Sequence, residues 1–329
     1  MSLNEIIRAA GIDRIPVEWV LHWDEVMSSY APPLPLTDEA FALLPTPIRE
    51  RLRTLWHRIT ADDVLDKLRA LCAYVAFECT PIWEEGGIWP MPSADWGGDW
   101  FYGCVLLSRL GEVMQTYADR GISRDILHDT LVDMEINTTL AQILYGRDGL
   151  VGVPFWWLTQ HFSAQLFQLG RLQFVFKHLE EPIVAAPFSL HVGDGVLDVH
   201  IPAGSHLTEN ACLHSYKEAQ AFYSAHFPEL EICAMICDSW LLDPILADFL
   251  AADSNILAFA RGFLHVRTSD EADDSILENV FEVRTDKYAS LPERTALQRA
   301  IKAHLLAGGR IHGTLGVRPY KGGCISHDQ

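Results

Sequence analysis

The segment EICAMICDSW (residues 231–240) is the stretch of sequence on which the fold of the C-terminal half depends. Its length and apolar composition are typical of a strand that is buried on both faces. Because side chains alternate between the two faces of a strand, Asp238 is the first polar group on an otherwise apolar face. The sequence therefore predicts a central strand with a carboxylate at its C-terminal end, which is where α/β sheets bind ligands.

Two roles are open for the polar groups that follow this strand. Partial burial raises the pKa of a carboxyl group, which would suit Asp238 to proton transfer. Alternatively, Asp238 or Ser239 caps the turn that follows. Asp243 is expected to cap a short helix that begins at Pro244. Cys237 is expected to pack in the core, because no partner that would activate its thiol is identifiable.

Strand and helix patterns alternate around this segment. Residues rich in β-branched and aromatic side chains predict strands at RLQFVFKHL (171–179), GVLDVHIP (195–202), GFLHVRT (262–268), NVFEVRT (279–285) and RIHGTLGV (310–317). Amphipathic patterns predict helices at SYKEAQAFYSAHF (215–227) and LPERTALQRAIKAHLLAGG (291–309). Thr295 is a possible N-cap of the second helix. This alternation is typical of a mixed α/β domain, which we expect over residues 171–329.

The first half of the chain carries helical patterns instead. Ser2 followed by Glu5 is a capping box at the start of a short helix that ends at Gly11. Apolar stripes at helical spacing predict further helices at about 61–80, 100–119, 124–145 and 154–169. The expected fold class is therefore α+β, with an all-helical N-terminal domain over residues 1–170 followed by the mixed α/β domain over 171–329.

The composition excludes several classes of protein. Apolar residues make up 49% and charged residues 21% of the 329 residues, as in ordinary globular proteins. The net charge of −19 repels phosphate backbones and anionic lipids, so we expect neither nucleic-acid binding nor membrane binding. The seven cysteines are scattered and lie mostly in apolar segments, and no signal peptide is recognisable. These features predict a cytoplasmic protein with reduced thiols.

No standard catalytic, phosphate-binding or zinc-binding motif is present in the sequence. Four potential metal ligands lie close together, at His200, His206, Cys212 and His214. Their spacing matches no standard zinc site, so no metal is expected. His200 shares a strand face with Asp198, and a histidine there could act as a base near neutral pH. The alternative is an ordinary hydrogen-bonded strand histidine.

Basic residues stand out against the acidic background. Candidate ligands for a phosphate or carboxylate group are Arg294, Arg299 and Lys302 on the predicted helix 291–309, together with Arg261. The alternative for the helix is an ordinary solvated face.

Tryptophans are unevenly distributed, since nine of the ten precede residue 171. Four lie in PIWEEGGIWPMPSADWGGDW (81–100), a segment whose glycines and prolines exclude a continuous helix. One interpretation is an aromatic wall over a ligand pocket. Its candidate residues are Trp89, Trp96, Trp100 and Trp240. The other interpretation is a loop that aromatic anchors fix to the helical core.

Several separated segments carry a resemblance to a known family. RLQF, VHIPAGSHL, SWLLDP with SNILAF downstream, and LPERTALQRAIKAHLLAGG resemble the GNAT-like C-terminal domain of a group of bacterial acyltransferase-domain proteins. The helical first half looks like the N-terminal domain that accompanies it. The resemblance implies a central mixed sheet and transfer of an acyl group from coenzyme A to an amine or a hydroxyl. It also implies a glycine-containing turn after the fourth strand that binds the pyrophosphate. If EICAMICDSW is that strand, the turn is DSWLLDPILADF (238–249), which has no glycine.

The leading hypothesis is an acyl-CoA-dependent N-acyltransferase that acts by direct transfer to an amine-type acceptor. Acyl-CoA would be a cosubstrate, with no permanently bound cofactor. Asp238 and His200 would transfer protons, and Ser239 would orient the substrate or donate to the developing oxyanion. The alternative hypothesis is a catalytically inactive protein that binds a small molecule with its tryptophan-rich loop, and a third is a scaffold protein. The sequence predicts no oligomeric state.

Overall fold

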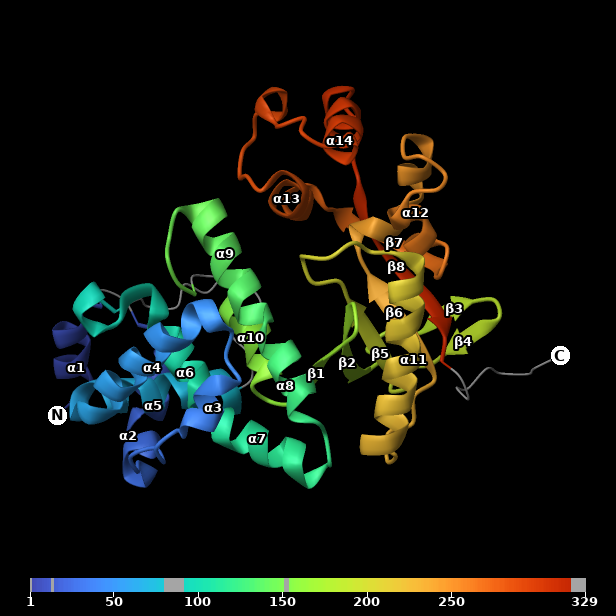
Figure 1. The fold of residues 1–329 in the computed structure, drawn as a ribbon. Coiled ribbons are helices and arrows are strands. Elements are labelled where there is room, and N and C mark those ends of the chain that lie inside the picture. The colour runs from blue at the N-terminus through green and yellow to red at the C-terminus, as the bar shows by residue number, and fades with distance from the viewer. Residues whose placement is uncertain (1, 13–14, 80–91, 151–153, 321–329) are drawn as a thin grey trace. The chain divides into compact units, whose positions relative to one another are not determined.

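A computed structural model describes residues 2–12, 15–79, 92–150 and 154–320 of the protein (Figure 1). The chain divides into two compact units, Met1–Gln165 and Leu166–Gln329. Each unit has its own secondary structure and its own buried core.

The N-terminal unit is helical throughout its described residues. Its α-helices are α1 (Leu3–Ala10), α2 (Val17–Ser29), α3 (Asp38–Ala42), α4 (Thr46–Ala61), α5 (Asp63–Glu78), α6 (Phe101–Leu107), α7 (Leu110–Asp119), α8 (Arg124–Leu131), α9 (Asp133–Tyr145) and α10 (Pro154–His161). The capping box of Ser2 and Glu5 is confirmed, and Gly11 ends α1 in the left-handed conformation. The predicted helices 100–119 and 124–145 are each divided into two, as α6 with α7 and as α8 with α9.

A buried polar contact joins α9 to α10 in this unit. Nε2 of His161 lies 2.9 Å from Oδ2 of Asp133, and both side chains are almost fully buried. The indole N–H of Trp157 donates to the same carboxylate oxygen over 2.7 Å. Buried polar groups stabilise a fold only when they are hydrogen-bonded, and this carboxylate has two partners that fix the two helices in one arrangement.

The C-terminal unit is built on a six-stranded mixed sheet. The strands of the unit are β1 (Leu166–Leu169), β2 (Leu172–His178), β3 (Ile183–Ala185), β4 (Phe188–Leu190), β5 (Gly195–His200), β6 (Ala234–Asp238), β7 (Leu264–Glu271) and β8 (His312–Pro319). The sheet order is β1-β2-β5-β6-β8-β7, and β3 and β4 form a separate antiparallel pair. Within the six-stranded sheet, β5 and β6 pair in parallel and the other neighbours pair antiparallel. The predicted α+β fold class is confirmed.

The two faces of the sheet have different coverings. On one face α11 (Glu209–His226) packs against β1 and β2, and the hydroxyl of Tyr223 donates to the carbonyl of Phe174 over 3.3 Å. On the other face Val196 and Ile236 form a core with Ile183 and Phe188 of the β3–β4 pair. The predicted alternation is confirmed, since Val196 and Ile236 lie on the face that Asp198, His200 and Asp238 share.

Short helices and turns connect β6 to β7 and β7 to β8. They are α12 (Asn255–Ala260), α13 (Asp273–Ile276) and α14 (Ala296–Leu306), with 3₁₀ turns at Trp240–Leu242 and Pro244–Asp248. Thr295 caps α14 and forms a capping box with Gln298, so the predicted cap is confirmed. Asp243 accepts from the backbone N–H of Ile245, as a cap before Pro244 should. Its second oxygen accepts from the backbone N–H of His312 over 2.7 Å, which ties the turn to β8.

Two sequence predictions of secondary structure are wrong. The helix expected over 154–169 ends at His161, and β1 begins at Leu166 because the chain turns at Ala164, which has a φ of 51°. The strand expected at NVFEVRT is instead a π-helical turn, Leu277–Phe281. Its apolar side chains bury against the α14 residue Ile301 rather than joining a sheet. Composition alone does not distinguish these two ways of burying β-branched and aromatic residues.

Candidate functional site

The parallel strands β5 and β6 diverge at their C-terminal ends. Pairing between them ends at Asp198 and Ile236. Beyond this point β5 continues to His200 in contact with β2, and β6 continues to Asp238 in contact with β8. Among the described residues, the last two of β5 (Val199 and His200) and the last two of β6 (Cys237 and Asp238) therefore form no backbone pair between these two strands. Ligands of α/β sheets bind at such carboxyl ends.

A histidine–carboxylate–lysine group lies on the face of β5 that carries the β3–β4 pair. Nε2 of His200 lies 3.5 Å from Oδ2 of Asp198, and Nζ of Lys177 on β2 donates to the same oxygen over 2.6 Å. Burial raises the pKa of Asp198, but the hydrogen bonds and charges of His200 and Lys177 outweigh burial and lower the pKa overall. Asp198 is therefore a stable anion that orients the His200 ring.

Asp238 lies on the same face and lines a cavity of about 330 Å³ with Lys177 and Arg267. Its pKa is raised, first by partial burial of the carboxyl group and second by the negative charge of Asp198. Arg267 and Lys177 oppose this shift without cancelling it. A carboxyl group in this state exchanges protons closer to neutral pH than an ordinary aspartate does.

Ser239 caps the turn that follows β6. Its hydroxyl accepts from the backbone N–H of Leu241 over 3.2 Å, and its backbone pairs with Thr314 of β8. Ser239 therefore fills the capping role that the sequence left open between Asp238 and Ser239.

The turn that begins the connection between the parallel strands follows β5 and not β6. The chain leaves β5 through residues 201–208, enters α11 and returns as β6. This turn contains Gly204, whose φ of 125° favours glycine over other residues. Thr208 caps α11 by accepting from the N–H of Ala211. A glycine-containing turn before a helix N-terminus is thus present, and its apparent lack at 238–249 came from taking β6 as the strand that precedes it.

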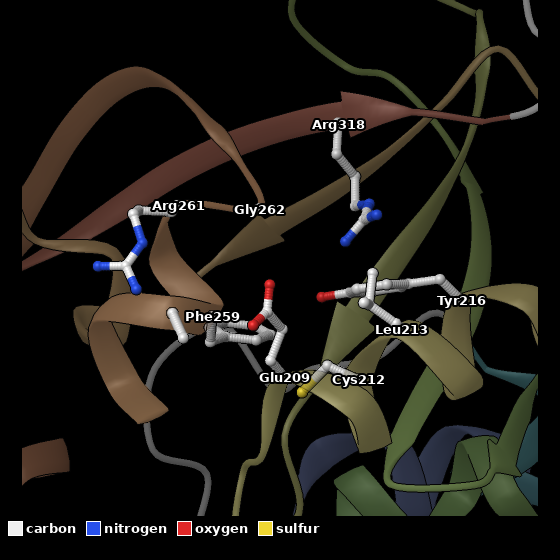
Figure 2. A pocket seen from close by; sticks show the side chains of 9 residues that line it. Glu209, Cys212, Leu213, Tyr216, Phe259, Arg261, Gly262 and Arg318 are labelled. Atoms are coloured by element: carbon white, nitrogen blue, oxygen red, sulfur yellow. The ribbon is translucent and has the colours of Figure 1, made fainter. Parts of the chain in front are cut away.

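A pocket of about 130 Å³ lies beside the N-terminal half of α11 (Figure 2). Its lining residue Arg318 pairs with Met235 of β6, so by alternation it lies on the face of the sheet opposite to Asp238. It is lined by residues of α11, α12 and β8. Arg261 and Arg318 supply two positive charges, and Glu209 in the first turn of α11 supplies a negative charge. The guanidinium of Arg318 stacks 3.3 Å from the ring centroid of Tyr216, and its Nε is buried with no hydrogen-bond partner among the described residues. Two arginines beside a helix N-terminus favour an anionic ligand.

The basic residues of α14 lie elsewhere in the unit and make local contacts. Lys302 donates to the carbonyl of Leu291 and pairs with Glu293 over 2.7 Å. Arg299 donates to the carbonyl of Glu293 over 2.9 Å. Arg294 lies just before the N-cap of the same helix, where its backbone N–H donates to the side chain of Gln298. Of the four basic residues predicted to bind a cofactor, the structure brings only Arg261 into the α11 pocket.

The candidate tryptophans occupy different units. Trp89 lies outside the described residues, and Trp96 is partly buried in the N-terminal unit. Trp100 is buried there under the guanidinium of Arg51, 4.8 Å from the ring centroid. Trp240 packs in the core of the C-terminal unit. The burial of Trp100 and Trp240 favours the interpretation that these two residues anchor the fold.

Sequence reasoning missed two charged residues of these sites. Lys177 and Arg318 reach their sites through sheet pairing, which a single sequence does not reveal. Residues 2–12, 15–79, 92–150 and 154–320 contain no cluster of three or more histidine, cysteine or acidic side chains arranged to hold a metal ion. In the same ranges no helix is both long and apolar enough to cross a membrane.

The fold and the site define a class of protein. A mixed sheet whose parallel strands diverge beside a helix N-terminus identifies the C-terminal unit as a GNAT-like domain. Comparison with protein families agrees, since the GNAT-like C-terminal domain matches residues 166–318 and the N-acyltransferase N-terminal domain matches residues 38–164. The protein belongs to the acyltransferase family that joins these two domains.

Solved structures of acyltransferases are similar over the whole chain. One is an acyltransferase in complex with decanoyl-CoA and teicoplanin, with a TM-score of 0.79 and 27% identity over 97% of this chain and 99% of that chain. A mutant acyltransferase with octanoyl-CoA and an acyltransferase with CoA and 10C-teicoplanin each have a TM-score of 0.78 and 26% identity at the same coverage. A search of curated proteins found no match.

Proposed function

We propose that the protein is a cytoplasmic acyl-CoA-dependent N-acyltransferase that moves an acyl group directly from the thioester to an amine acceptor. The divergence of β5 and β6 carries this proposal, because it lies between an anion-binding pocket on one face and the His200–Asp198 pair on the other. The similar acyltransferases that hold decanoyl-CoA, octanoyl-CoA or CoA support acyl-CoA as the donor.

The donor is anchored by its phosphates in the α11 pocket. Arg261 and Arg318 neutralise the phosphate charge, and the backbone N–H groups at the start of α11 donate to phosphate oxygens. The pantetheine arm then runs along the unpaired strand edges at Val199 and Cys237, whose backbone groups supply hydrogen bonds. This path brings the thioester to the ends of β5 and β6.

His200 acts as the base that takes a proton from the acceptor amine. When the proton on Nε2 faces Asp198, the lone pair of the neutral ring is on Nδ1. The amine nitrogen forms a bond to the thioester carbon, the C–S bond breaks, and the CoA thiolate leaves and takes up a proton. Asp238, with its raised pKa, exchanges protons with the acceptor or the leaving group at the other strand end. Glu180, Glu181 and Asp238 line the cavity on this face against Lys177 and Arg267, and this excess of carboxylates attracts a cationic amine.

Binding is tested before turnover. Calorimetry should detect binding of CoA, octanoyl-CoA and decanoyl-CoA. The proposal would be contradicted if the protein bound none of the three. Release of free thiol from decanoyl-CoA is then measured with a panel of amines that includes a glycopeptide, amino sugars and polyamines. Binding of decanoyl-CoA without thiol release with any acceptor would instead favour a protein that binds acyl-CoA and has lost catalysis.

The His200→Gln variant tests the assigned base. General base catalysis contributes about 10²- to 10⁴-fold, so thiol release should fall by that factor while the Kd for decanoyl-CoA stays unchanged. His191→Gln is the matched control, because the His191 side chain is 78% exposed on a loop outside the site. A His200→Gln enzyme with the turnover of the control would remove His200 from the mechanism.

A further inference from the structure

The turn between β1 and β2 is locked onto α11. Gly170 adopts a φ of 67°, and a Cβ atom at this position would lie 2.8 Å from the hydroxyl of Ser215. Only glycine therefore combines this backbone conformation with so close an approach to the helix. The turn and the helix meet at Ser215, which is fully buried.

The Ser215 hydroxyl connects the two elements by hydrogen bonds. It accepts from the backbone N–H of Arg171 over 2.7 Å and from that of Leu172 over 3.3 Å. It donates to the carbonyl of Ala211, in the first turn of α11, over 3.1 Å. The backbone of Arg171 is therefore fixed relative to the helix end that lines the anion-binding pocket.

The side chain of Arg171 extends from this fixed point to the turn 201–208. Its Nε–H donates to the carbonyl of Ser205 over 2.8 Å. Residues 203–206 are exposed, so few packing contacts are available to hold this part of the turn in place. Arg171 does not line the pocket itself. The hydrogen bond to Ser205 therefore acts on the turn, next to the N-terminus of α11.

We propose that Arg171 is a positioning residue that holds the turn 201–208 in the conformation that binds the phosphates of the donor. The inference rests on the proposed function, since it assigns that turn to acyl-CoA. A preorganised turn loses less conformational freedom on binding than a free one, so the Arg171–Ser205 bond raises affinity for the phosphate end of the donor. It leaves the pantetheine end unaffected.

The test compares two ligands and three variants by calorimetry. CoA carries the phosphates, and pantetheine lacks them. Arg171→Met removes the donor while keeping much of the side-chain length, and Arg171→Lys keeps a charged donor. Arg49→Met is the matched control, because Arg49 also donates its Nε–H to a backbone carbonyl, that of Leu44, in the N-terminal unit. Hydrogen exchange of the amides of residues 203–207 reports the order of the turn without ligand.

We expect Arg171→Met to weaken CoA binding about tenfold and to change pantetheine binding by less than about twofold. Amide exchange at 203–207 should be faster in this variant, and Arg171→Lys should recover most of both effects. Unchanged CoA affinity, or equal losses for CoA and pantetheine, would overturn the inference. So would weaker CoA binding with unchanged exchange, because Arg171 would then act through its charge alone. Failure of the wild-type protein to bind CoA would instead remove the proposed function.

Discussion

Asp198 and Asp238 lie on the same face of neighbouring strands, yet their pKa values shift in opposite directions. Asp198 is the more buried of the two, but two basic side chains contact its carboxylate and lower its pKa. Asp238 is more exposed and receives less compensation, so partial burial and the charge of Asp198 raise its pKa. The pairing of charges, rather than the depth of burial, decides the state of each carboxyl group.

These shifts predict opposite effects of neutralising the two side chains. The lowered pKa of Asp198 contributes stability above the ordinary value of 3.8, and this contribution is lost as pH falls through the folded pKa below 3.8. Asp198→Asn should therefore destabilise the protein at pH 7 by about 2 kcal/mol, less than for a fully buried pair because Lys177 reaches solvent. The midpoint temperature of thermal denaturation should be lower for Asp198→Asn than for the wild type from pH 8 downward. The difference between the two proteins should shrink only near pH 3.

Asp238→Asn should change the stability of the protein in the opposite direction. A raised pKa costs stability above the folded pKa, and this cost disappears below 3.8, so the variant should be more stable than the wild type near neutral pH. Solvent screening keeps the gain below about 1 kcal/mol. If Asp238 transfers protons, the same variant should also have a lower turnover, because active-site residues often reduce the stability of the fold while they support activity. Equal and same-signed effects of the two substitutions would refute this account of the pair.

At this scale the sequence predicted part of the site. Alternation placed Asp198 with His200 on one face of their strand, and Asp238 at the end of the apolar face of another strand, because the period of a strand is fixed. That these two faces coincide follows from the register between β5 and β6. It did not reveal Lys177 as a partner of Asp198, because that contact depends on the register between β2 and β5. Arg318 was missed for a related reason, since it lies on β8, the last strand along the chain, and its place in the sheet depends on pairing with β6.

At the scale of elements, α11 makes the connection between the two parallel strands and presents its N-terminus to the pocket. Helix N-termini attract anions, and a carboxylate in the first turn gains from the same partial charge. Glu209 lies at that position and also lines the pocket. In the proposed complex with the donor, Glu209 would therefore compete with a phosphate group for the helix end and for the field of Arg261 and Arg318.

Glu209→Gln should accordingly bind CoA more tightly, by about two- to fivefold, because one repulsive charge is removed from an exposed site. The protein should become slightly less stable, because the helix loses a favourable charge worth about 0.3–1 kcal/mol. Calorimetry at low salt measures the first effect and thermal denaturation the second. Glu218→Gln is the control, as it makes the same change further along α11. Weaker CoA binding by Glu209→Gln would mean that Glu209 contacts the donor favourably.

The elements that sequence reasoning identified best are those with explicit end signals. The capping boxes at Ser2 and Thr295 define helix starts in the sequence and in the structure. The elements that it missed lack such signals. β1 follows directly on a helical pattern, and the π-helical turn at Leu277–Phe281 has the composition of a strand. In both segments, tertiary pairing or packing decides between conformations that the local sequence permits.

At the scale of the whole molecule, the family relationship extends over both units, and so does the likeness to solved acyltransferases. The sequence predicted this organisation from the change of periodicity near residue 170 and from several separated segments. The sequence did not identify the turn after β5 as the one that resembles a pyrophosphate-binding turn, because the order of strands along the chain does not show which two strands pair in parallel. Once the sheet order is known, the turn that leaves β5 is the one that meets a helix N-terminus.

The net charge of −19 predicts an unusual salt dependence for donor binding. CoA is anionic, so the field of the whole molecule opposes its approach, whereas Arg261 and Arg318 attract it only at short range. Salt shortens the Debye length from about 30 Å at 0.01 M to about 8 Å at 0.15 M and so screens the distant repulsion first. The association rate constant of CoA, measured by stopped flow, should therefore rise about two- to fivefold over this range, while that of the uncharged ligand pantetheine should stay nearly constant. A rate for CoA that falls steadily with salt would show instead that the two arginines dominate the field along the whole path of approach.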